Sequence, residues 1–125
     1  MTINEAIARV DDLRDNTVAT DIKIAWLQMV DQQVYLEIIK GREGAEAVTI
    51  PDYSDNDNNG GRVLLVPPPY DMLYVYRLEA EICYKSEEID RQANALTRYN
   101  ELMDAFAKHY AREHRSLPHP PAIYY

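Results

Sequence analysis

The feature that most constrains the fold is a run of three prolines, Pro67–Pro69, followed by two stretches of helically spaced apolar residues. Consecutive prolines impose an extended approach, and proline is tolerated in the first turn of a helix. The spacing predicts a helix from about Pro69 to Cys83 or Tyr84, and its broad apolar stripe indicates a central helix that is contacted on several sides. The stripe is expected to carry Leu73, Tyr76, Ala80 and Cys83, broadened by Met72, Val75 and Ile82.

A second long helix is predicted after a break at Lys85–Glu88. Ser86 is expected to cap it, because serine accepts hydrogen bonds from free N–H groups at a helix start. The apolar spacing extends this helix from about Glu87 to His114. Its expected stripe consists of Ile89, Ala93, Leu96, Asn100, Met103, Ala107 and Tyr110. The sequence leaves open whether the two helices are instead one bent helix.

The N-terminal part of the chain predicts two further helices. The first covers residues 2–14, where Thr2 and Glu5 have the spacing of a capping box. Its expected stripe is Ile3, Ile7, Val10 and Leu13 or Arg14. The second runs from about Thr20 or Asp21 to Lys40; its last part is also compatible with a strand, and length favours a helix. Its expected stripe is Ile22, Ala25, Trp26, Met29 and Val30.

The segment 41–69 between the second and third helices is irregular by composition. Residues 47–50 and 62–66 are strand candidates, and the stretch between them is rich in turn-forming residues. The predicted fold class is therefore mainly α: a small bundle of about four helices, with a long loop or β-hairpin between helices two and three.

The length of 125 residues fits one domain that needs neither disulfides nor a metal to form a core. We assign residues 1–115 to this single helical domain and residues 116–125 to a proline-rich C-terminal arm. Three prolines exclude a helix in the arm, which is expected to be disordered or to dock its aromatic end on a neighbour.

The charge balance narrows the classes of partner. There are 21 acidic and 13 basic residues, a net charge of -8, which argues against non-specific nucleic-acid binding and against an anionic membrane surface. No stretch is long and apolar enough for a transmembrane helix, and the acidic N-terminus does not resemble a signal peptide. Cys83 is the only cysteine and fits a reducing compartment. We expect a protein that is cytoplasmic when it is made.

No motif predicts an enzyme. Asp55, Asp57 and Asn59, with Gly60, match the first half of a calcium-binding EF-hand loop, but Val66 stands where a bidentate Glu is needed. A weak Ca²⁺ site on the surface is one interpretation, and a solvated turn is the favoured one. The spacing of His109, His114 and His119 does not suit zinc, and no serine lies in a nucleophile elbow. The sequence therefore predicts no catalytic residue and no cofactor.

The tyrosine content suggests a surface for partners, since the chain has ten Tyr, one Trp and one Phe. Tyrosine combines an apolar ring with a polar tip and is common in interfaces. A Tyr-rich edge of the core is an equally weighted alternative. The interface candidates are Tyr53, Asp55, Asp57, Tyr70, Tyr74, Tyr124 and Tyr125, with Tyr70 and Tyr74 expected on one helix face.

The string LLVPPPYDMLYVYRLEAEICYKSEEIDRQANALTRYNELMDAFAKHYAREHR, which starts at Leu64, resembles the head-tail connector (adaptor) proteins of tailed phages. Its marks are a hydrophobic-Pro-x-Pro-Tyr-Asp segment that starts a helix and a last helix with Phe and Tyr near its end. TINEAIARVDDLRDN and KIAWLQMVDQQVYLEII also resemble the start of such proteins, so the resemblance covers about residues 2–115.

The resemblance implies a structural subunit that assembles as a homo-oligomeric ring, about twelve-fold, beneath the portal protein. Such a ring extends the DNA channel without binding DNA specifically, and it docks a further connector or tail protein. The implied location is the head-tail junction of the virion, after assembly in the host bacterial cytoplasm. An alternative hypothesis is a small helical protein-binding or regulatory module that acts as a monomer or dimer.

Overall fold

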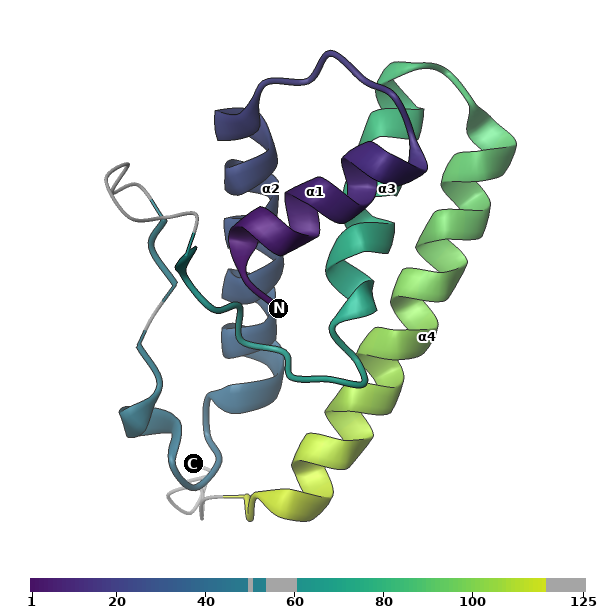
Figure 1. The fold of residues 1–125 in the computed structure, drawn as a ribbon. Coiled ribbons are helices and arrows are strands. Elements are labelled where there is room, and N and C mark those ends of the chain that lie inside the picture. The colour runs from purple at the N-terminus through teal and green to yellow at the C-terminus, as the bar shows by residue number, and fades with distance from the viewer. Residues whose placement is uncertain (50, 54–60, 117–125) are drawn as a thin grey trace, which may run out of the picture.

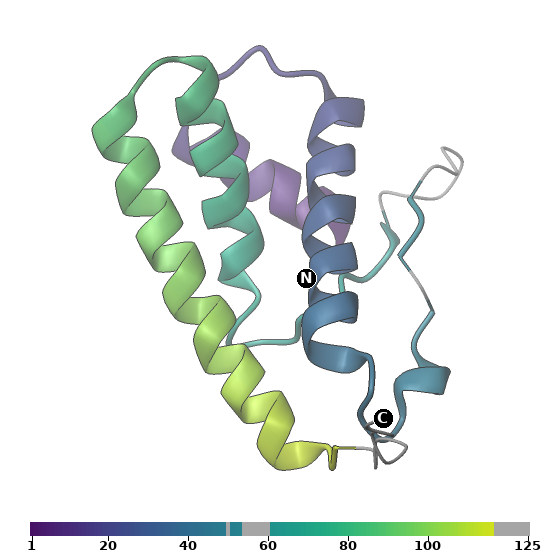
Figure 2. The same ribbon diagram turned by 180° about the vertical axis from the view of Figure 1, so that it is seen from behind.

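The computed structural model describes residues 1–49, 51–53 and 61–116. The prediction of a mainly α bundle is confirmed: the described residues form four α-helices, and no strand is assigned among them. Helices α2, α3 and α4 lie side by side, and α1 crosses one face of α2 and α3 (Figure 1). Seen from behind, α1 lies on the far side of this layer (Figure 2). The bundle therefore has one face covered by α1 and an opposite face that α1 leaves uncovered.

Helix α1 spans Ile3–Leu13 and begins at the expected cap. The Glu5 backbone N–H donates to the Thr2 hydroxyl at 3.2 Å, which satisfies one free donor of the first turn. The Glu5 carboxylate accepts a hydrogen bond from the Thr2 hydroxyl at 3.3 Å. The buried face consists of Ile3, Ala6, Ile7 and Val10, whereas Leu13 is exposed.

Helix α2 spans Thr20–Val34 and continues as one wide turn, the π-helix η1 at Tyr35–Ile39. The predicted length is thus confirmed, but the predicted stripe is largely wrong. Ile22 and Met29 are exposed, and the buried side chains are Lys23, Leu27, Val30, Asp31 and Val34. The apolar spacing misled because two of the buried positions carry charged side chains whose partners come from other parts of the chain.

Of the two alternatives predicted for the segment between η1 and α3, a long loop or a β-hairpin, its described residues fit the loop, since they contain no strand. It turns at Gly41 and Gly44, whose φ angles of 86° and 83° favour glycine, and forms the short 3₁₀ helix η2 at Ala45–Ala47. Residues 62–64 bond instead to the N-terminus: the Ile3 N–H donates to the Arg62 carbonyl at 3.0 Å. The segment predicted as strand 62–66 thus pairs, through backbone hydrogen bonds, with residues 1–3 at the start of the chain.

Helices α3, Met72–Lys85, and α4, Ile89–Glu113, are separate, with the break at the expected place. Ser86 does not cap α4: its hydroxyl donates to the Ile82 carbonyl at the end of α3. The chain reverses at Glu87, which has a positive φ of 59°. Helix α3 packs against the other three α-helices, as expected for a central helix.

The buried face of α4 differs from the predicted stripe. Its buried residues are Ala95, Tyr99 and Phe106, whereas Ile89 is exposed. The C-terminal end of α4 is tied to the turn after η1: the Glu43 N–H donates to the Arg115 carbonyl at 2.9 Å, and Arg42 pairs with Ser116 in an isolated bridge. These contacts hold the end of α4 against the turn that contains Arg42 and Glu43.

Candidate functional site

The three interface candidates that the structure describes, Tyr53, Tyr70 and Tyr74, do not form one exposed surface. Tyr74 is fully buried and Tyr53 is 5% exposed, so the prediction that both lie on a surface is wrong. Tyr70 precedes α3 rather than lying on it, and its ring packs against Phe106 and His109 of α4, with centroids 5.9 and 5.5 Å away. Tyrosine was expected at the surface because of its polar tip, but here the tips of Tyr53 and Tyr74 find acceptors in the core.

The remaining sequence candidates, Asp55, Asp57, Asn59, Tyr124 and Tyr125, lie outside the described residues.

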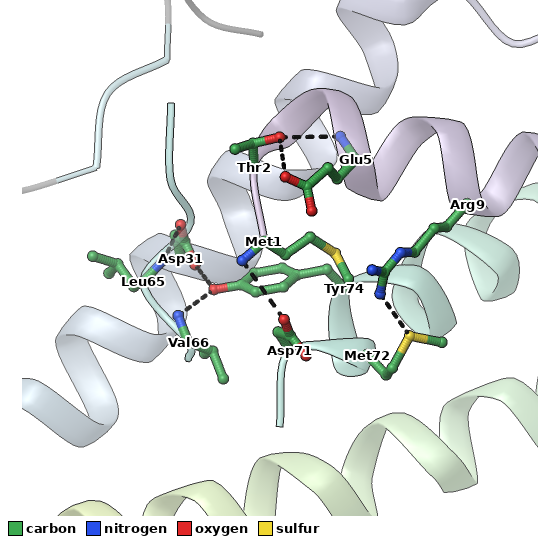
Figure 3. A network of polar contacts seen from close by, with 10 residues as sticks. All are labelled: Met1, Thr2, Glu5, Arg9, Asp31, Leu65, Val66, Asp71, Met72 and Tyr74. Atoms are coloured by element: carbon green, nitrogen blue, oxygen red, sulfur yellow. Dashed lines mark hydrogen bonds and ion pairs between the residues drawn. The ribbon is translucent and has the colours of Figure 1, made fainter. Parts of the chain in front are cut away.

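The most organised group of polar side chains surrounds Asp31 of α2, which is 0% exposed. The hydroxyl groups of Tyr53 and Tyr74 donate to its two carboxylate oxygens. The Leu65 N–H donates to one of them at 3.2 Å. The Tyr74 hydroxyl also accepts from the Val66 N–H at 2.8 Å (Figure 3). We call these five residues the Asp31 cluster.

The Asp31 cluster joins elements that are far apart in the sequence. Asp31 lies on α2 and Tyr74 on α3. Tyr53, Leu65 and Val66 lie in the long segment between η1 and α3, residues 40–71, which we call the connection. An ionised carboxylate accepts hydrogen bonds but donates none. The Asp31 carboxylate accepts three, from the Tyr53 hydroxyl, the Leu65 N–H and the Tyr74 hydroxyl. The connection is thus fastened to the bundle at two points by one buried carboxylate.

A second contact fastens the same connection to α1. The Leu64 N–H donates to the Met1 carbonyl at 2.9 Å. The Met1 amino nitrogen lies 3.6 Å from the Asp71 carboxylate, immediately before α3 (Figure 3). The segment from Leu64 to Asp71 is therefore held on both sides, and it delivers α3 in one fixed position.

Burial dominates the electrostatics of the Asp31 cluster. Removal from water raises the pKa of Asp31 above 3.8, and the hydrogen bonds from Tyr53, Tyr74 and Leu65 only partly oppose this rise. Burial, and then the nearby Asp31 carboxylate, raise the pKa of Tyr53 and of Tyr74 well above 10. Both hydroxyls therefore remain protonated donors. The cluster is closed to solvent and internally paired, and this arrangement fastens chain segments rather than presenting a carboxylate to a substrate.

Sequence reasoning missed Asp31 as an organising residue. The available signal was its place between Leu27 and Val34, where spacings of four and three put a charged residue on a buried helical stripe. A buried carboxylate needs donors, and the sequence does not say which tyrosines supply them.

A second feature is apolar surface on the outside of α2 and η1. Ile22, Met29 and Leu36 are exposed. Beside Leu36, a groove of about 430 Å³ is lined by Gln32, Tyr35, Leu36, Lys40 and Pro51. Exposed apolar residues mark interaction sites where they form a large contiguous patch or line a groove.

The described residues contain no group of three or more His, Cys, Asp and Glu side chains that is placed to hold a metal ion. Cys83 is buried in α3 as a free thiol. No helix in the described part of the chain is long and apolar enough to cross a membrane. Comparison of the chain with protein-family models, with curated proteins and with solved structures finds no match.

Proposed function

We propose that the protein is a structural subunit of the head-tail connector of a tailed phage. The observation that carries the proposal is the resemblance of the sequence from Leu64 onward to that family, above all the VPPPYD segment that precedes the third helix. The anchoring of this segment supports it. A subunit that transmits contacts between two neighbours needs a fixed geometry, and Leu65 and Val66 are bonded into the Asp31 cluster.

We propose that the subunit forms a ring beneath the portal, of about twelve copies by the family resemblance, and docks a further connector or tail protein on the other side. It then belongs to the head-tail junction of the virion and assembles in the host bacterial cytoplasm. The net charge of -8 supports a channel through which DNA passes without adhering, because a basic lining would hold the phosphates.

A closed ring requires head-to-tail contacts, so each subunit must offer two unlike surfaces that fit one another. The layer of α2, α3 and α4 has two unlike faces, because α1 covers only one of them (Figures 1 and 2). Exposed Ile22 and Met29 on α2 supply apolar area for such a contact. These features support ring assembly over a role that needs a single binding surface.

The test measures the size of the particle that this chain forms with and without a portal protein. The portal protein used is one encoded by a gene that neighbours the gene for this chain. We expect light scattering to detect species larger than a dimer on mixing, and electron microscopy to show rings. A chain that stays monomeric or dimeric at high concentration, with or without portal, contradicts the proposal. That result favours the alternative, a small helical binding or regulatory module.

A further inference from the structure

The groove beside η1 has the chemistry of a site for an extended, proline-rich segment. Tyr35, Leu36 and Pro51 give it an aromatic and apolar lining, to which Lys40 adds a cationic side chain. Leu36 is 61% exposed, so its side chain offers apolar surface to a segment that occupies the groove. The Gln32 side-chain amide donates to the Pro51 carbonyl at 3.2 Å, which holds the two walls together.

Polyproline II segments bind to grooves of this composition. Their backbone makes no internal hydrogen bonds, so the carbonyl groups remain available to donors, and the proline rings pack on aromatic side chains. Tyr35 supplies the aromatic ring and Lys40 the donor. The groove is therefore suited to a chain that carries several prolines and few charges.

The sequence of this protein contains such a segment. Residues 117–125, which lie outside the described residues, read LPHPPAIYY: three prolines, no acidic or basic residue other than His119, and the apolar side chains Leu117 and Ile123. The other proline-rich stretch, Pro67–Pro69, already forms the approach to α3.

The chain is led toward the groove by contacts at the end of α4. Ser116 pairs with Arg42, and the Arg42 guanidinium donates to the His114 carbonyl at 3.1 Å. Arg42 stands two residues after Lys40, which lines the groove. Ser116, the last described residue, is therefore paired with a residue only two positions from one that lines the groove. Pro51 lines the same groove from the part of the connection that follows η2.

We propose that the groove lined by Tyr35, Leu36, Lys40 and Pro51 binds residues 117–125 of the same chain as an extended polyproline-type segment. The reach is sufficient: nine residues in this conformation span about 28 Å. The helical path from Gln32 to Lys40 is eight residues long and covers about 12 Å. Docking within one chain is favoured because the short tether gives an effective concentration in the millimolar range. The inference does not depend on the ring.

The test compares two variants of the full chain that carry the same new charge. Leu36→Asp places a carboxylate in the groove, whereas Met29→Asp places one on α2 outside it. The two side chains are matched in exposure, at 61% and 59%, so both variants are expected to fold. The measurement is the heteronuclear ¹H–¹⁵N NOE of residues 122–125, which distinguishes ordered from free backbone on the ps–ns timescale.

We expect high NOE values in the parent chain and in Met29→Asp, and their loss in Leu36→Asp. We also expect cross-peaks between the Ile123 methyl groups and the Tyr35 ring in the parent chain and in Met29→Asp, and their absence in Leu36→Asp. Low NOE values in the parent chain, or equal behaviour of the two variants, overturn the proposal. Ordering that disappears on tenfold dilution also overturns it, because this result assigns the groove to the segment of a second copy.

Discussion

The Asp31 cluster makes its clearest prediction at Tyr74, whose hydroxyl has two partners. Tyr74→Phe keeps the ring, so it opens no cavity, and it removes only the oxygen that donates to Asp31 and accepts from the Val66 N–H. Both partners lie where water cannot replace the oxygen, since Asp31, Val66 and Tyr74 are each 0% exposed.

The magnitude follows from these two losses. A buried N–H left without an acceptor costs about 1–3 kcal/mol, and a hydrogen bond to a charged group contributes about 1.5–3 kcal/mol. We therefore expect Tyr74→Phe to lower the free energy of unfolding by about 2.5–6 kcal/mol. This is a large share of the stability of a domain of this size.

The assay is urea denaturation followed by far-ultraviolet circular dichroism, which gives the midpoint and the slope separately. The control is Tyr84→Phe on the same helix, whose side chain is 68% exposed. A surface hydroxyl of this kind is expected to change stability by less than about 0.5 kcal/mol. A cost below about 1 kcal/mol for Tyr74→Phe, with an unchanged slope, refutes the reasoning, because the hydroxyl then does not hold the connection to the bundle.

Three further predictions concern Asp31, the pair Asp11–Lys23 and Tyr99. Burial raises the pKa of Asp31 above 3.8, so just above pH 3.8 the folded protein keeps a proton on Asp31 that the unfolded chain has lost. We therefore expect urea titrations from pH 4 to 7 to show that the parent chain loses stability relative to Asp31→Asn as the pH rises. A stability difference between the two proteins that stays constant, or that changes in favour of the parent chain, contradicts this. Burial alone raises the pKa of Asp11, but the hydrogen bonds from Lys23 and Asn16 and the charge of Lys23 outweigh burial and lower the pKa below 3.8. The Asp11–Lys23 pair therefore stabilises the fold fully above pH ~3.8, and this contribution is lost as the pH falls through the pKa of Asp11 in the folded protein. Asp11→Ala leaves the buried Lys23 ammonium without its 2.7 Å partner. We expect a cost of about 1–2 kcal/mol at pH 7, below that of a fully buried pair because Asp11 is half exposed, and a smaller cost at a pH well below 3.8 by the same assay. The buried Tyr99 hydroxyl has no hydrogen-bond partner in the described part of the chain. Tyr99→Phe is therefore expected to leave the free energy of unfolding unchanged or to raise it by up to about 2 kcal/mol, with a melting temperature that is equal or higher. A clear drop in melting temperature shows that the hydroxyl is hydrogen-bonded in solution.

The helices and their limits were largely predictable because they depend on local chemistry. Thr2 at the start of α1, the two glycines after η1 and the prolines before α3 act on their nearest neighbours in the chain. The break between α3 and α4 was placed correctly at Lys85–Glu88, although the role given to Ser86 was wrong. Boundary signals of this kind operate within a few residues and can be read directly from the sequence.

The sequence by itself determined a mainly α chain with a long connection between its second and third helices. Only the tertiary structure decided which faces are buried and where the connection is fastened. The partners of Asp31 lie 22, 34 and 43 residues away, at Tyr53, Leu65 and Tyr74. A buried carboxylate is stable only where several donors converge, and this convergence depends on packing rather than on local spacing. The same physics turned Tyr53 and Tyr74 inward, because a tyrosine whose hydroxyl finds an acceptor in the core need not keep that hydroxyl in water.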